Sequence, residues 1–170
     1  RIILNGLNNT MTENIKIPFV DLYPQYEELQ SEIDFAIREI ISKSDFITGS
    51  TVDKFEKAIC EYTKSEDCAS IGSGTNALVC ALKALGVGPG HQVMTVGHTF
   101  VSTTEAIVNV GATPVFVDID EFYHLDISKL QLADTLKAIL FVDLYGQTPD
   151  IDKIKDFAKT LDVKIYENLL

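Results

Sequence analysis

The sequence predicts an α/β fold whose core is a mostly parallel β-sheet covered by helices. Short apolar runs rich in β-branched residues, such as Gln92 to Val96, recur along the second half of the chain. Longer segments with apolar residues at helical spacing lie between these runs. Strand-like runs that alternate with helices are typical of parallel sheets. With 170 residues, the chain is long enough for one domain with a hydrophobic core.

The first part of the chain predicts two helices. Pro24 opens a helical pattern, because proline is favoured in the first turn of a helix. A polar break from Lys43 to Ser50, closed by Gly49, separates it from the second pattern. The apolar positions of the two helices are Leu29, Ile33, Ile37 and Ile40, then Val52, Phe55, Ile59 and Tyr62. We expect residues 17–66 to form an N-terminal helical arm and residues 1–16 to be a non-native or disordered leader.

Residues 67–170 carry the alternating elements of the predicted α/β domain. A strand is expected near Cys68 to Ile71, and a helix from about Asn76 to Leu85. The glycine-rich segment Gly86 to Gly90 ends that helix and turns the chain. Further strands are predicted at 92–96, 114–117, 137–142 and 163–166, and further helices at 99–110, stopped by Gly111, and at 150–160.

Composition excludes several classes of protein. The net charge of −11 argues against nucleic acid or an anionic membrane as the main partner, although a local pocket can still bind an anion. No apolar run approaches membrane-spanning length, and the first ten residues are too weakly apolar for a signal peptide. Hydrophobic residues make up 46% of the chain, as in ordinary globular proteins.

Cysteine and histidine spacing gives no sign of a metal site. Cys60, Cys68 and Cys80 form no C-x-x-C pair, and each lies in an apolar stretch, which indicates buried reduced thiols in a cytoplasmic protein. The three histidines are scattered and lack ligand spacing. We therefore predict no bound metal.

The segment from Ser70 to Thr75, Ser-Ile-Gly-Ser-Gly-Thr, is the clearest candidate for ligand binding. It lies between the strand expected at 68–71 and the following helix. Unpaired backbone N–H groups and the helix dipole favour an anion at such a place, and glycine allows a phosphate to approach the backbone closely. The alternative is an ordinary helix cap. The segment is neither a P-loop nor a G-x-G-x-x-G motif.

Three further segments follow predicted strands and have both a functional and a structural interpretation. Phe100 either stacks on a flat heterocycle or belongs to the core. The stretch from Asp143 to Gln147 either lines a pocket or forms a turn that uses the backbone freedom of Gly146. Asp118 and Asp120 fit a solvated turn as well as a site.

The ordered set of these segments resembles the DegT/DnrJ/EryC1/StrS family of pyridoxal-phosphate (PLP) sugar aminotransferases. The segments that carry the resemblance are IPFVDLYPQY, ITGSTVDKFEKAI, SGTNALVCALKALGVGPGHQVMTVGHTFVSTTEAIVNVGATPVFVDID and DLYGQTPDIDKI. The resemblance extends from about Ile17 to Glu167. It implies the large α/β domain of fold-type I PLP-dependent transferases, truncated, without the small C-terminal domain.

The resemblance also assigns roles to individual residues. Gly74, Thr75 and Asn76 match the loop that holds the PLP phosphate through backbone N–H groups and the threonine hydroxyl. Phe100 matches the aromatic residue that stacks on the pyridine ring. Gln147 lies in a segment that borders the pocket, without a clear role of its own. Asp143 stands where the family usually has a histidine, which leaves the role of that position open.

The end of the chain departs from the family. Where the family has Glu-Asp-Ala-Ala-Gln, this chain has Glu167, Asn168 and two leucines, so Asn168 replaces the aspartate that pairs with the pyridinium nitrogen. The lysine that binds PLP covalently has no counterpart among these residues, so we assign no catalytic residue. Lys164 is close in sequence, but it fits a surface lysine at the end of a strand far better.

The resemblance implies transamination of a nucleotide-diphosphate keto sugar by a cytoplasmic homodimer, with glutamate (or glutamine) as amino donor, for surface polysaccharide or glycan biosynthesis. The 170 residues by themselves are expected to be inactive. Two alternatives remain open. One is a non-catalytic remnant that at most binds a phosphate or a partner chain. The other is a PLP sugar dehydratase of the same fold.

Overall fold

The computed structural model describes residues 18–130, 133–159 and 163–169, so the expected leader at 1–16 lies outside the described residues. The chain divides into two compact units, Arg1–Cys68 and Ala69–Leu170. We describe each unit by itself.

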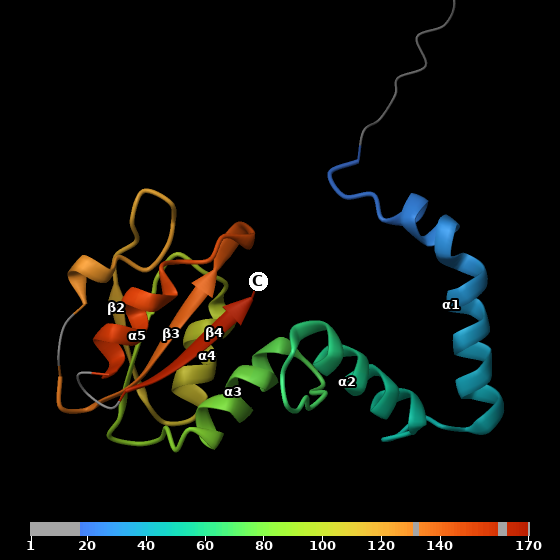
Figure 1. The fold of residues 1–170 in the computed structure, drawn as a ribbon, viewed down its shortest axis with the longest axis horizontal. Helices are drawn as coiled ribbons and strands as arrows, with labels where there is room; N and C mark the ends of the chain where they lie inside the picture. Colours follow the sequence, from blue (N-terminus) through green and yellow to red (C-terminus); the bar gives the residue numbers. More distant parts are fainter. Residues whose placement is uncertain (1–17, 131–132, 160–162, 170) are drawn as a thin grey trace, which may run out of the picture. The chain divides into compact units, whose positions relative to one another are not determined.

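The first unit contains the two helices expected of the N-terminal arm, α1 (Tyr23–Lys43) and α2 (Ser50–Thr63), drawn in blue and cyan-green in Figure 1. Pro24 lies in the first turn of α1, as predicted, and Gly49 is the N-cap of α2. Neither helix has a buried residue. Large apolar side chains of α1 are therefore open to solvent, with Phe35 67% and Ile41 58% exposed.

The second unit is built on a four-stranded parallel sheet, which confirms the predicted fold class. The strands are β1 (Gln92–Val96), β2 (Thr113–Val117), β3 (Leu136–Asp143) and β4 (Lys164–Leu169). Their order is β2-β1-β3-β4, and every neighbouring pair is parallel. All carboxyl ends of the strands therefore lie at the same edge of the sheet.

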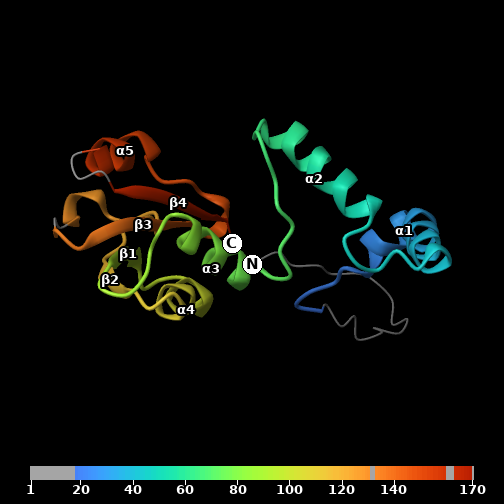
Figure 2. The same cartoon turned by 90° about the horizontal axis from the view of Figure 1, so that it is seen from below.

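Helices cover both faces of this sheet (Figures 1 and 2). Helices α3 (Gly74–Ala84) and α4 (Val101–Asn109) pack on one face, where Leu82, Ile107 and Leu140 belong to one buried cluster. Helix α5 (Ile151–Lys159) packs on the other face, where Ile154 lies with Ile139 and Phe141. Two short 3-10 helices, η1 (Ile127–Lys129) and η2 (Leu144–Gly146), flank β3 in the sequence.

Two expectations about local structure were wrong, and one expected helix begins two residues later than predicted. Residues 68–71 form no strand, because a strand needs a hydrogen-bonded neighbour and no strand in the described part of the chain pairs with them. The helix expected from Thr99 begins at Val101 instead, with Phe100 as its extended N-cap. The cysteines are free but not buried, since Cys80 is exposed and the other two are half-buried.

The other element boundaries agree with the sequence to within a few residues. The helices of the described ranges include none that is both long and apolar enough to cross a membrane.

Two glycines that end helices adopt left-handed backbone conformations, with φ of +74° at Gly86 and +81° at Gly111. A Cβ on Gly111 would lie 2.9 Å from Cγ of Pro89, whereas a Cβ on Gly86 would meet nothing within 4 Å. The two positions therefore share the backbone requirement but differ in the space around them.

We predict that Gly111→Ala destabilises the fold more than Gly86→Ala. Both changes place Ala in the left-handed region at a cost of about 1–2 kcal/mol, and the contact with Pro89 adds about 1–3 kcal/mol of overpacking at Gly111 only. Urea denaturation of the two variants measures the difference in the free energy of unfolding. Equal losses would show that Pro89 moves aside without cost.

Candidate functional site

The loops that follow the strands meet at the carboxyl edge of the sheet, where open α/β sheets bind their ligands. Residues 97–100 follow β1, the loop from Asp118 follows β2, and residues 144–147 follow β3. The candidate segments at Phe100 and at Asp143–Gln147 are therefore brought to one edge. Helix α3, which begins at the third candidate segment, packs against α4 on the face described above.

The first turn of α3 is capped by Ser73. Its backbone is extended, and its hydroxyl accepts a hydrogen bond from the N–H of Asn76 at 3.2 Å. Gly74 and Thr75 occupy the first helical positions, whose N–H groups have no acceptor within the helix. A ligand anion would therefore meet Gly74 and Thr75 first, while Asn76 donates to the cap.

The glycines of this turn leave it open to a ligand. A Cβ built on Gly72 or Gly74 meets nothing within 4 Å, and both residues are exposed. Neither has a positive φ, so glycine is not required there by backbone conformation. What glycine provides here is free space beside the backbone, which is what close approach of a phosphate requires.

Phe100 is not a core residue. Its side chain is 61% exposed, which excludes the core interpretation that the sequence left open. As N-cap of α4 it has φ −72° and ψ 145°, and its carbonyl accepts from the N–H of Thr103 at 3.1 Å. With Gly97, Thr104 and Phe116, it lines an open pocket of about 420 Å³.

Asp143 ends β3 and is the buried carboxyl group of this edge, 1% exposed. The hydroxyl of Thr148 donates to its Oδ2 at 3.1 Å. Its Oδ1 is buried, and within the described residues it meets no N–H or hydroxyl donor. A hydrogen bond to Asp143 raises the pKa of Glu167 on β4, and burial adds to this effect.

The segment after Asp143 is a turn, which was one of the two interpretations of its sequence. Tyr145 and Gly146 both have positive φ, +60° and +76°, and Gly146 provides the freedom expected of it. Gln147 is exposed beyond the turn. The backbone of Asn168 lies opposite Val142 in the parallel register, and the side chain of Asn168 lies outside the described residues.

Sequence reasoning missed an aromatic cluster at this edge. The rings of His98 and Tyr123 stack at a centroid distance of 5.3 Å, and Tyr145 meets the edge of Tyr123 at 5.8 Å. These residues come from three different loops, and Tyr123 also has a positive φ of +67°. No sequence pattern joins them, since only the parallel register brings the three loops together.

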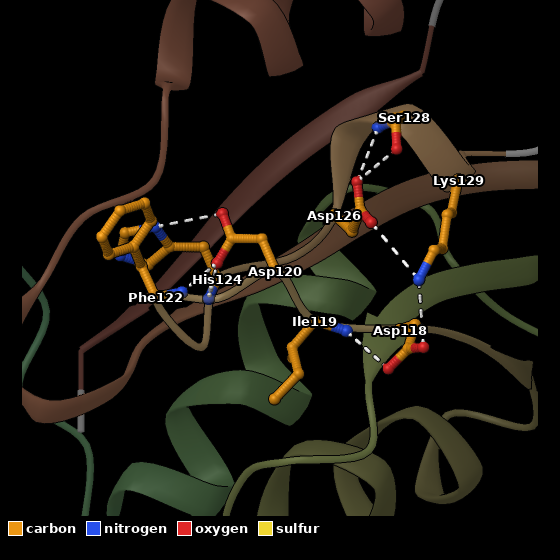
Figure 3. Close-up of polar contacts among 8 residues, drawn as sticks. All are labelled: Asp118, Ile119, Asp120, Phe122, His124, Asp126, Ser128 and Lys129. Carbon is orange, nitrogen blue, oxygen red and sulfur yellow. Dashed lines mark hydrogen bonds and ion pairs between the residues drawn. The ribbon is translucent and has the colours of Figure 1, made fainter.

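Asp118 and Asp120 belong to a turn network in the loop after β2 (Figure 3). Lys129 bonds Asp118 at 3.1 Å, and this bond lowers the pKa of Asp118 and raises that of Lys129. Asp126 caps η1 through Ser128, whose hydroxyl bond lowers the pKa of Asp126. Asp120 Oδ1 accepts from the N–H groups of Phe122 and His124.

The carboxylates of this network are occupied by donors of their own loop. The arrangement supports the solvated-turn interpretation of Asp118 and Asp120. These bonds fix the conformation of the loop and so position the ring of Tyr123 on that of His98.

Comparisons with known proteins identify the family. The model of the DegT/DnrJ/EryC1/StrS aminotransferase family matches residues 27–168. The UDP-2-acetamido-2-deoxy-3-oxo-D-glucuronate aminotransferase of Pseudomonas aeruginosa is 38% identical over 155 residues, which are 89% of this chain and 43% of that protein.

Two solved structures share the fold. DesV from S. venezuelae, in complex with a ketimine intermediate, has a TM-score of 0.87 and 33% identity, covering 89% of this chain and 42% of DesV. NtdA from Bacillus subtilis, with bound cofactor PMP, has a TM-score of 0.86 and 26% identity, covering 96% of this chain and 39% of NtdA. The chain thus spans about two fifths of the length of the proteins it matches. It belongs to the DegT/DnrJ/EryC1/StrS aminotransferase family.

Proposed function

We propose that the protein represented by this chain is a PLP-dependent aminotransferase that converts a nucleotide-linked keto sugar into an amino sugar. The observation that carries the proposal is the open first turn of α3, in a chain that the family model matches over residues 27–168. Gly74 and Thr75 supply two N–H groups and a hydroxyl to a phosphate. Asn76 completes the turn through its bond to Ser73.

The described residues fit the cofactor. A phosphate dianion is stabilised by the N-terminal dipole of α3, and the space beside Gly72 and Gly74 admits it. The exposed ring of Phe100 is free to stack on a flat heterocycle and so to orient it. When bound, PLP supplies the electron sink for amino-group transfer.

Asn168 stands where the family places an aspartate. A neutral amide can accept or donate a hydrogen bond, but it carries no charge to keep the ring nitrogen of the cofactor protonated. This observation favours the second candidate, a non-catalytic protein that binds a phosphate or a partner chain. Cofactor binding without amino transfer in the longer protein would distinguish the second candidate from the first.

The proposal extends to partners and location. Glutamate is the proposed amino donor, and the product is proposed to enter surface polysaccharide or other glycan synthesis in the cytoplasm. A homodimer is supported by the exposed apolar residues of α1, because large apolar patches mark interaction surfaces. The division into a helical arm at 17–66 and a partial large domain at 67–170 is part of the same proposal.

In the longer protein, Thr75→Val should weaken PLP retention by about 10- to 100-fold, because a hydrogen bond to a charged group is worth about 1.5–3 kcal/mol. Equilibrium dialysis followed by PLP absorbance measures the dissociation constant. Thr113→Val, on an exposed position of β2, is the matched control and should retain wild-type affinity. Equal affinities of the two variants would contradict a phosphate role for Thr75.

Phe100→Ala in the longer protein should raise the PLP dissociation constant by about 2- to 12-fold beyond the effect of lost area, which corresponds to the 0.5–1.5 kcal/mol of an aromatic contact. Phe100→Tyr keeps a ring and should restore binding. Phe122→Ala, at a similarly exposed position in the loop after β2, serves as control. A Phe100→Ala variant with wild-type affinity and absorbance would exclude stacking.

The 170-residue chain by itself should show no transamination. No lysine in it matches the covalent cofactor position, and Asn168 lacks the carboxylate charge. The purified chain is incubated with PLP, glutamate and a panel of nucleotide keto sugars, and 2-oxoglutarate is measured. Formation of 2-oxoglutarate at a higher rate than with free PLP alone would overturn this expectation. A borohydride-reducible adduct of PLP with one lysine would overturn it as well.

A further inference from the structure

At the buried end of β3, no N–H or hydroxyl donor of the described residues reaches Oδ1 of Asp143. Asp143 is 1% exposed, and Thr148 satisfies only its Oδ2. A buried acceptor without a donor costs free energy, and a buried charge costs more. Oδ1 therefore requires a hydrogen atom from a neighbouring group.

Glu167 is the neighbour that can supply it. In the parallel register of β3 and β4, Glu167 lies opposite Phe141, and Asp143 lies two residues further along β3. Residues two apart on a strand project from the same face, so both carboxyl side chains belong to the face covered by α5. Diagonal neighbours of this kind on adjacent strands have Cα atoms about 7–8 Å apart, a separation that a glutamate side chain can span, and Asp143 raises the pKa of Glu167.

We propose that Asp143 and Glu167 share one proton, with Glu167 as the donor and Oδ1 of Asp143 as the acceptor, and that this bond holds the carboxyl end of β4 against β3. Asp143 then accepts from both Thr148 and Glu167, so it ties the loop before α5, β3 and β4 together. Asp143 is a positioning residue in this arrangement. The pair itself does not depend on the proposed function.

The charges around the pair define its pH dependence. Asp143 raises the pKa of Glu167 through the hydrogen bond and through charge, burial adds to this, and Lys155 on α5 opposes it. At the start of α5, Asp150 and Lys153 neutralise each other at 2.9 Å.

On the loop after β2, His124 lines a pocket together with Thr148, and its Nδ1 lies 3.6 Å from Oδ2 of Asp120. His124 thus has its own carboxylate partner when it is protonated. Asp126 lines the same pocket and is engaged by Ser128 and Lys129.

The sign of the effect on stability follows from the raised pKa of Glu167. A group whose pKa is higher in the folded state stabilises that state fully below its unfolded pKa, which is about 4.3 for glutamate. This stabilisation is lost as the pH rises through the folded pKa. Asp118, Asp126 and Asp150 have lowered pKa values and act in the opposite sense, losing stabilisation only as the pH falls below about 4.

Urea denaturation of the 170-residue chain between pH 5 and pH 8 tests the proposal. The folding equilibrium constant of the wild type should fall with rising pH relative to that of Glu167→Gln, by at most tenfold per pH unit as for one proton. The amide of Glu167→Gln donates to Asp143 at every pH, so this variant should be the more stable one at pH 8. Glu105→Gln, an exposed acid on α4, is the matched control and should follow the wild type.

Infrared spectroscopy provides a direct second measurement that does not depend on folding energies. At pH 5, the wild type and Glu105→Gln should show the C=O band of a protonated carboxylic acid that Glu167→Gln lacks. Asp143→Asn should lose the band as well, since its amide donates to an ionised Glu167. Parallel stability profiles of wild type and Glu167→Gln, or a wild type without the band, would overturn the shared proton.

Discussion

The structure of the α/β unit depends on the burial of β3 on both faces. Along this strand, Ala138 and Leu140 point into the cluster with α3 and α4, and Ile139 and Phe141 into the cluster with α5. A strand that is covered on both faces and paired on both edges must satisfy its polar groups within the sheet. Parallel pairing with β1 and β4 does so, and even the buried hydroxyl of Thr95 bonds the carbonyl of Leu140 at 2.8 Å. The parallel direction then collects all strand ends at one edge.

The candidate binding features of the chain lie at the ends of its helices and strands. The start of a helix exposes unpaired N–H groups, as α3 does at Gly74 and Thr75. A loop that leaves the carboxyl edge of the sheet can present a ring to solvent, as the loop after β1 does with Phe100. The same edge carries the cost of polar groups at the ends of buried strands. Asp143 is the clearest case, because it is the last residue of β3 and is as buried as the apolar residues that precede it.

The loop after β2 shows how an acidic sequence can be structural. Asp118, Asp120 and Asp126 each bond a donor of the same loop, either an N–H group or Lys129 (Figure 3). With a net charge of −11, the chain offers many acidic candidates for a site, and most of those in the described ranges are exposed. The three carboxylates of this loop accept hydrogen bonds from donors of the loop. Asp143 differs from them, because its Oδ1 meets no N–H or hydroxyl donor within the described residues.

The sequence by itself determined the elements and the fold class. Local patterns are sufficient for this, since Pro24 is in the first turn of α1, Gly111 ends α4, and Gln92 to Val96 form β1 as predicted. Residues 68–71 show the limit, because β-rich composition makes a strand only where a partner strand exists. Only the tertiary structure decided that Phe100 is exposed, that His98, Tyr123 and Tyr145 meet, and that Asp143 is buried on the same face of the sheet as Glu167. These relations join residues from separate loops and strands, and they arise from the parallel register, which no local pattern encodes.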